Sequence, residues 1–112
     1  MFTAIVNGNG TFLKGGIERL YLHINKTAGA GLPWRVGRVP VILVIGGTEY
    51  TGELCARSDY PYLYVGSQLR DAHGVLHKLT HILLANEFCK KDRARILVDG
   101  NRLTVARMCD AD

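Results

Sequence analysis

The sequence predicts a mainly β (α+β) fold, a small antiparallel β-barrel of about six to seven strands with one main helix. Two apolar-rich segments, 39–45 and 48–56, flank a Gly-Gly pair that can adopt positive φ, as the turn of a hairpin requires. Residues 94–107 repeat this layout around an Asp-Gly turn. Two hairpins with sequential pairing allow a sheet to close on itself, so we expect a single β-barrel domain over residues 1–112.

The N-terminal part of the chain is predicted to supply three strands. Residues 2–6 and 11–14 are short strand candidates separated by Asn-Gly-Asn-Gly, which is typical of a turn with positive φ. Residues 17–24 then alternate between apolar and polar side chains. We therefore expect Leu22 on the inner face of the barrel and His23 on the wetter outer face.

A loop is predicted between the first strands and the central hairpin. Residues 26–38 contain three glycines and a proline and show no regular period, and segments of this kind often carry function in small domains. Trp34 fits two roles there, a platform that stacks on a ligand or a plug at one end of the barrel, and the plug is the more common. Beyond the loop and the central hairpin, residues 61–65 are predicted to form a further strand.

The period of the apolar residues changes after this strand. Ser67 is typical of a helix N-cap, so a short helix is predicted over about 67–73, ended by Gly74. A main helix is predicted over about 75–88, because its apolar side chains recur at the 3.6-residue spacing of one helix face. The final hairpin follows this main helix.

Composition and cysteine usage exclude several classes of protein. No segment approaches the ~20 consecutive apolar residues of a membrane helix, and the first residues lack the pattern of a signal peptide. Cys55, Cys89 and Cys109 are odd in number and lack zinc-finger spacing, as expected for reduced thiols. We therefore expect a cytoplasmic protein with no disulfide, no metal and no cofactor, and no association with a membrane.

Residues that could carry metal binding or catalysis are sparse. His73, His77 and His81 recur every four residues, and a pair at this spacing on a helix can hold a transition metal. A glycine interrupts the run and no carboxylate or thiol follows at the matching position, so an exposed polar helix face is the preferred interpretation. Ser58 and Ser67 are the only serines, and neither lies in a nucleophile elbow. The protein is therefore not expected to be an enzyme.

Basic side chains are unevenly distributed within the net charge of +4. Residues 20–47 carry three basic and no acidic side chains, and residues 89–107 carry six basic and two acidic ones. Such clusters attract phosphates, although basic residues also protect strand edges as a solvated rim. The leading hypothesis is a non-catalytic module that binds nucleic acid, DNA first, or another polyanion. The basic rim of this hypothesis comprises Arg35, Arg38, Lys90, Lys91, Arg93 and Arg95.

A stripe of tyrosines supports a different function. Tyr60, Tyr62 and Tyr64 share one face of the predicted strand, where they can stack on bases or coat a barrel wall or a subunit contact. The first alternative function is therefore binding of a small molecule or peptide in the barrel mouth, lined by Trp34 and these tyrosines. The second is a structural domain that oligomerises, most simply as a homodimer.

Two resemblances to known families point to a barrel. Leu69-Arg70-x-Ala72 and the charged bend at 90–93 before the last hairpin resemble the second half of AbrB-type and plant B3-type DNA-binding pseudobarrels, which implies DNA binding. Over most of the chain the sequence is similar to a bacterial small β-barrel family of unknown function that often occurs with bacteriocin-protection proteins. That similarity is carried by Gly37-Arg38-Val39-Pro40-Val41, Ile45-Gly46-Gly47, Tyr50, Leu54, Tyr64-Val65 and Leu69-Arg70-x-Ala72-x-Gly74.

Overall fold

The computed structural model describes residues 2–26, 31–32 and 34–108. Strands form most of this part of the chain, together with one short helix. In chain order the elements are β1 (Phe2–Phe12), β2 (Glu18–Asn25), β3 (Gly37–Ile45), β4 (Thr48–Ala56), β5 (Tyr62–Val65), β6 (Gln68–Arg70), β7 (Leu76–Lys78), α1 (Leu79–Ala85), β8 (Arg93–Asp99) and β9 (Arg102–Arg107).

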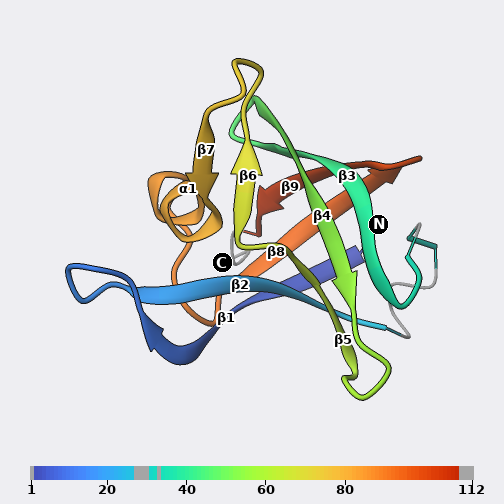
Figure 1. The fold of residues 1–112 in the computed structure, drawn as a ribbon, viewed down its shortest axis with the longest axis horizontal. Helices are drawn as coiled ribbons and strands as arrows, with labels where there is room; N and C mark the ends of the chain where they lie inside the picture. The colour runs from blue at the N-terminus through green and yellow to red at the C-terminus, as the bar shows by residue number, and fades with distance from the viewer. Residues whose placement is uncertain (1, 27–30, 33, 109–112) are drawn as a thin grey trace.

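Seven strands close into a barrel (Figure 1). Their order is β3-β9-β8-β1-β2-β5-β4, and β4 pairs with β3 to complete the ring. Six of these pairings are antiparallel, and the pairing of β3 with β9 is parallel. A closed ring with an odd number of strands needs at least one parallel pairing, because strand direction must reverse an even number of times around it. The predicted small, mainly antiparallel β-barrel is confirmed, and one of its seven pairings is parallel.

Both predicted hairpins are present. In the β3–β4 hairpin, Gly46 and Gly47 both have positive φ, 60° and 77°, between the paired residues Ile45 and Thr48. In the β8–β9 hairpin, Gly100 has φ 60° at the first turn position, as a type II′ turn requires. These turns fix the register of two of the seven barrel pairings.

The predicted turn at Asn-Gly-Asn-Gly is wrong, because this segment lies within the single strand β1. The pairing of β1 with β2 shifts register between Gly8 and Phe12, so the strand absorbs the glycines as an irregularity. Glu18 helps to hold it, since its carboxylate accepts the Gly10 N–H at 3.1 Å. The chain instead reverses at Gly15-Gly16, where φ is 98° and 83°.

The short helix predicted over 67–73 is also wrong, because β6 and β7 form a hairpin there. Asp71 directs the turn: its Oδ1 accepts the N–H groups of His73 and Val75 at 2.9 and 3.0 Å. The carbonyl of Ser67 accepts the Leu79 N–H at 2.9 Å and so closes the base of the hairpin.

The main helix predicted over 75–88 is reduced to α1. Its first residues are taken by β7, whose backbone pairs with β6. At its other end, Asn86 donates from Nδ2 to the Ile82 carbonyl at 2.8 Å, and Glu87 leaves the helical region with φ 67°. The helical period in the sequence therefore marks a true helix of seven residues rather than fourteen.

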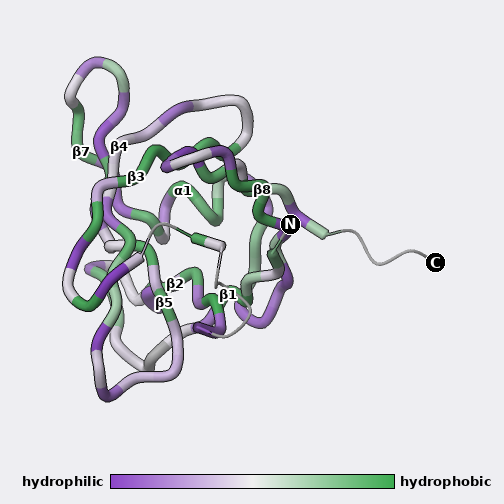
Figure 2. The backbone as a smooth tube through the Cα atoms, turned by 90° about the vertical axis from the view of Figure 1, so that its right-hand side faces the viewer, coloured by the Kyte–Doolittle hydropathy of each residue, from purple (hydrophilic) through white to green (hydrophobic). Residues whose placement is uncertain are grey.

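The barrel interior is a packed hydrophobic core. Leu22, Ile24, Leu63 and Val65 are fully buried on β2 and β5, and α1 adds Leu83 at the end of the barrel that it covers. Figure 2 shows hydrophilic residues gathered at the outer turns and hydrophobic stretches of α1 and the strands nearer the middle. Because inner positions are filled by aliphatic side chains, alternate positions on these strands face outward.

One leucine seats the β6–β7 hairpin on the barrel. Leu69 of β6 is fully buried, and it lies over Gly52 of β4, where an added Cβ would stand 2.1 Å from Leu69 Cδ2. The backbone pairing of β4 with β6 consists of a single registered pair, Thr51 with Arg70. The hairpin therefore depends on the space that Gly52 leaves open.

Replacing this glycine tests the seat. We expect Gly52→Ala to lower the free energy of unfolding by about 1–3 kcal/mol, because Leu69 must move out of a packed position. Urea denaturation measures the loss, and hydrogen exchange should show reduced protection in β6 and β7. Gly66→Ala is the matched control, since a Cβ there meets the Glu53 carbonyl at an ordinary 3.6 Å. Equal stabilities for the two variants would contradict this account.

Candidate ligand-binding surface

Two adjacent strands present aromatic rings on the outer wall of the barrel. Leu63 and Val65 point into the core, so Tyr62 and Tyr64 of β5 point outward. The same alternation on β2 turns Tyr21 and His23 outward. His23 is registered with Tyr64, which brings the two sets of rings together.

These rings, with Tyr60, form a connected aromatic cluster. His23 stacks on Tyr21 with ring centroids 5.9 Å apart, and on Tyr62 at 5.6 Å. Tyr60 meets the edges of His23, Tyr62 and Tyr64 at 5.9, 5.6 and 6.4 Å. All five side chains are half-buried, so each keeps part of its ring open to solvent. The tyrosines thus coat the outer wall rather than the mouth of the barrel.

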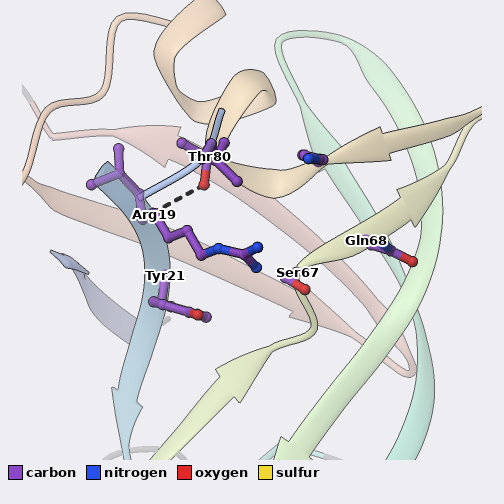
Figure 3. A pocket seen from close by; sticks show the side chains of 8 residues that line it. Arg19, Tyr21, Ser67, Gln68 and Thr80 are labelled. Carbon is purple, nitrogen blue, oxygen red and sulfur yellow. Dashed lines mark hydrogen bonds between the residues drawn. The ribbon is translucent and has the colours of Figure 1, made fainter. Parts of the chain in front are cut away.

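Two grooves run along this wall. The first has a volume of about 310 Å³ and is lined by Tyr21, His23, Arg57, Tyr60 and Tyr64. The second, of about 320 Å³, shares Tyr21 and Tyr64 with the first. A smaller pocket of about 70 Å³ also includes Tyr21 and lies beside Arg19 (Figure 3). Shared lining residues make the three hollows one continuous surface.

The strand register places an arginine on each side of the aromatic cluster. Arg93 pairs with Ile5, which pairs with His23, so this arginine stands two strands from a ring. On the other side Tyr64 pairs with Cys55, which pairs with Arg38. Neighbouring strands lie about 4.8 Å apart, so each arginine is about 10 Å from the cluster along the wall. The full row across six strands is Arg93, Ile5, His23, Tyr64, Cys55 and Arg38.

The six basic residues predicted from the sequence fall into two groups. Arg35 and Arg38 lie before and at the start of β3, whereas the other four lie in 90–95, at the start of β8. These two starts are on different sides of the molecule (Figure 1). The structure therefore places one arginine from each group two strands, about 10 Å, from the aromatic cluster and does not assemble all six on one rim.

Two of these cations, Lys90 and Arg38, have carboxylate partners. Lys90 Nζ lies 3.1 and 3.2 Å from the two carboxylate oxygens of Glu18, and this hydrogen bond lowers the pKa of Glu18. Arg38 Nη1 lies 3.5 Å from Glu53. Arg93 and Arg95 are exposed on β8. Ion pairs at the surface are weak in water, so an incoming anion can compete with the carboxylates for Lys90 and Arg38.

The bend before β8 has a backbone role. Lys91 adopts φ 75°, and its N–H donates to the Val6 carbonyl at 2.6 Å. Val6 in turn donates to the Asp92 carbonyl at 2.8 Å, so the bend extends the pairing of β8 with β1. The Lys91 side chain is exposed.

Trp34 lies apart from the tyrosines. Its ring is partly buried against the core cluster, and Lys26 Nζ lies 5.6 Å from the ring centroid. It does not line the groove around the aromatic cluster. This placement agrees with a plug more closely than with a stacking platform.

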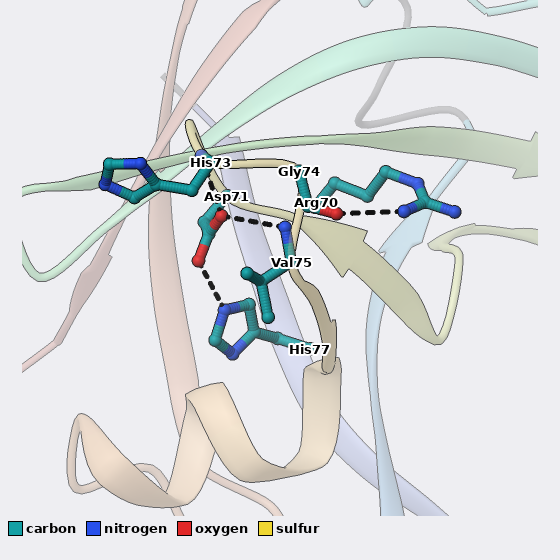
Figure 4. A network of polar contacts seen from close by, with 6 residues as sticks. All are labelled: Arg70, Asp71, His73, Gly74, Val75 and His77. Carbon is teal, nitrogen blue, oxygen red and sulfur yellow. Dashed lines mark hydrogen bonds and ion pairs between the residues drawn. The ribbon is translucent and has the colours of Figure 1, made fainter.

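The three regularly spaced histidines do not share a helix. His77 on β7 pairs with Asp71 at 2.8 Å between Nε2 and Oδ2, while the His73 ring points away from it (Figure 4). His81 lies on α1. The helical spacing behind the metal hypothesis is therefore missing. Within 2–26, 31–32 and 34–108, no three His, Cys, Asp or Glu side chains are close enough to hold a metal ion.

Sequence reasoning missed several residues of this surface. Tyr21 has the outward parity of His23, which is a signal that the sequence carried. Arg19 shares this parity, and its place beside a pocket appears only in the structure, as does the place of Arg57 in the groove around the rings. Arg57 is held by Asp59, with Nε to Oδ1 at 3.2 Å and Nη2 to Oδ2 at 3.0 Å, and this pairing lowers the pKa of Asp59.

Comparison with protein-family models, with curated proteins and with solved structures finds no match for this chain. The resemblances noted above therefore stay predictions. In the part of the chain that the structure describes, no helix has the length and apolar character to cross a membrane.

The environment of His23 predicts a pH dependence. Burial lowers the pKa of His23 below its usual value, and Asn7 Nδ2 donates to its Nδ1 at 3.2 Å, which requires that nitrogen to be unprotonated. The unfolded chain thus binds the proton more readily, and stability falls as pH drops through about 6.5.

We expect the free energy of unfolding to be lower at about pH 5.5 than at about pH 7.5, in part because of this histidine. His23→Gln should shrink the difference between the two pH values in urea denaturation. His81→Gln, on an exposed position of α1, should leave it unchanged. An undiminished difference in the His23 variant would refute the assignment.

Proposed function

We propose that the protein is a non-catalytic binding module for nucleic acid that takes a single DNA strand along the outer wall of its barrel. One observation carries the proposal: the registered row in which an arginine stands on each side of the aromatic cluster. Aromatic rings stack on bases, and arginines bind phosphates. The proposal keeps Arg38 and Arg93 of the predicted basic set as the nearest phosphate contacts.

A single strand fits this surface better than a duplex. The cluster offers ring faces and edges, and a base can stack on them only when its own face is uncovered. In a duplex the base faces are covered by their neighbours, and only groove edges and phosphates are accessible. Among the described residues, no helix is long enough to serve as a recognition helix in the major groove, since α1 has seven residues.

Fluorescence anisotropy with a labelled oligothymidine at low salt tests this function. Tyr60→Leu and Tyr64→Leu should each weaken binding about fivefold or more, since stacking contributes about 1–3 kcal/mol per base. Affinity should fall with salt, and Arg38→Gln should reduce the salt slope by about 0.7.

The control for these variants is Arg102→Gln. This arginine lies on β9, on the far side of the ring from β2 and β5, and is paired with Glu49 at 2.8 Å. Binding should survive this change. Failure of the wild-type protein to bind the oligonucleotide, or equal losses in the Arg102 and tyrosine variants, would sink the proposal.

A second candidate function is binding of a small aromatic molecule or a peptide on the same wall. The groove of about 310 Å³ around the cluster favours it, because that volume lies at the lower end of small-molecule sites. A third is a homodimer contact through the same rings. Sedimentation velocity of the free protein separates these two, because only the dimer contact requires a doubled mass without ligand.

A further inference from the structure

The barrel has a seam beside β2. β5 pairs only with residues 23–25 of β2, so the first half of β2 has no strand on that side. Leu20 there donates its N–H to the hydroxyl of Thr80 in α1 at 3.0 Å, and the base of the β6–β7 hairpin lies opposite. A gap remains between β2 and the hairpin.

The pocket of about 70 Å³ occupies this gap, and we call it the seam pocket. Its apolar part comes from Leu13 and Leu20, and its polar part from both sides of the seam. The polar residues are Arg19, Tyr21, Ser67, Gln68, Lys78 and Thr80. Figure 3 shows the Arg19 side chain extending from β2 across the space toward Ser67.

The electrostatics of the seam pocket favour an anion. Two of its lining side chains, Arg19 and Lys78, are cationic, and none of the described residues that line it is acidic. Arg19 is half-buried and has no carboxylate partner within the described residues, unlike Arg38, Arg57 and Arg102. Its guanidinium donors thus face a polar space without an internal anion to satisfy them.

Size and donor geometry select the anion. At about 70 Å³ the pocket is small, which suits one tetrahedral oxyanion rather than a larger ligand. A planar guanidinium, an ammonium, a hydroxyl and an amide surround this space, and such a set matches the several oxygens of a phosphate. We propose that the seam pocket is a phosphate-binding subsite.

The position of the pocket connects it to the aromatic cluster. Tyr21 lines both the seam pocket and the groove of about 310 Å³. A phosphate in the pocket can therefore belong to a nucleotide whose base stacks on the rings. The identity of the ligand as a nucleotide rests on the proposed function, whereas affinity for a phosphate group does not.

NMR titration of the wild-type protein tests the subsite. Inorganic phosphate and thymidine 5′-monophosphate should both shift the backbone amides of Ser67 and Gln68 and the Nε–H of Arg19, and thymidine without phosphate should not shift the last of these. Arg19→Gln should weaken binding of the monophosphate about tenfold, as expected for loss of a charge-assisted contact. Phosphate shifts confined to other residues, or none at all, would overturn the subsite.

Three further variants separate a specific site from general charge attraction. Arg19→Lys keeps the charge but loses the planar fork, so its affinity should fall between those of wild type and Arg19→Gln. Lys78→Gln should weaken binding, while Lys14→Gln, an exposed lysine outside the pocket, should not. Equal effects of the two lysine changes would mean general charge attraction and would refute the subsite.

The same variants separate the subsite from the proposed function. If phosphate shifts Arg19 but oligothymidine does not bind, the subsite is supported and the nucleic-acid function fails. If oligothymidine binding depends on Tyr60 and Tyr64 but neither phosphate nor the monophosphate shifts the Nε–H of Arg19, the function is supported and the subsite fails. Circular dichroism of each variant confirms that the barrel is folded before binding is compared.

Discussion

Closure of the strand ring is the constraint on which the rest of the structure depends. β3 and β9 pair in parallel, from Ile42 with Arg102 to Ile45 with Val105, and this one pairing joins the two hairpins into a barrel. Following the registered pairs once around the ring returns to β3 about ten residues further along, which is the stagger that tilts the strands. Closure then separates an inner face, filled with aliphatic side chains, from an outer one.

The stagger also determines which side chains lie next to one another on the outer face of the barrel. Arg38 and Arg93 lie far apart in the sequence and on different sides of the barrel, yet the same row of pairs leads from each to the aromatic rings. A shift of one residue in any of these strands would turn its outward side chains into the core. The same register that packs Leu22 and Leu63 inside therefore also holds His23 against Tyr62 and Tyr64 outside.

Local patterns predicted the parts of the fold that depend on neighbours in sequence. The glycines of the two tight turns and the alternation of β2 identified hairpins and faces correctly. The β6–β7 hairpin was missed because its turn is organised by the Asp71 side chain and its position by the space over Gly52, neither of which appears in a periodicity.

The candidate binding surface also has one part that the sequence predicted and another that depends on tertiary contacts. The tyrosine stripe was visible as a spacing, but its contact with β2 required the register of two strands that the β3–β4 hairpin and its flanking loops separate in the chain. The seam shows what such a register can create. Because β5 pairs with residues 23–25 of β2 and does not extend along the first half of that strand, a helix hydroxyl and a hairpin base cover this edge, and neither fills it completely. Buried backbone groups need hydrogen-bond partners, and at this edge of β2 the Thr80 hydroxyl is such a partner. Polar side chains therefore line the seam pocket. An imperfect strand pairing thus produces a polar hollow in the wall of an otherwise aliphatic barrel, next to the rings that the same pairing assembles.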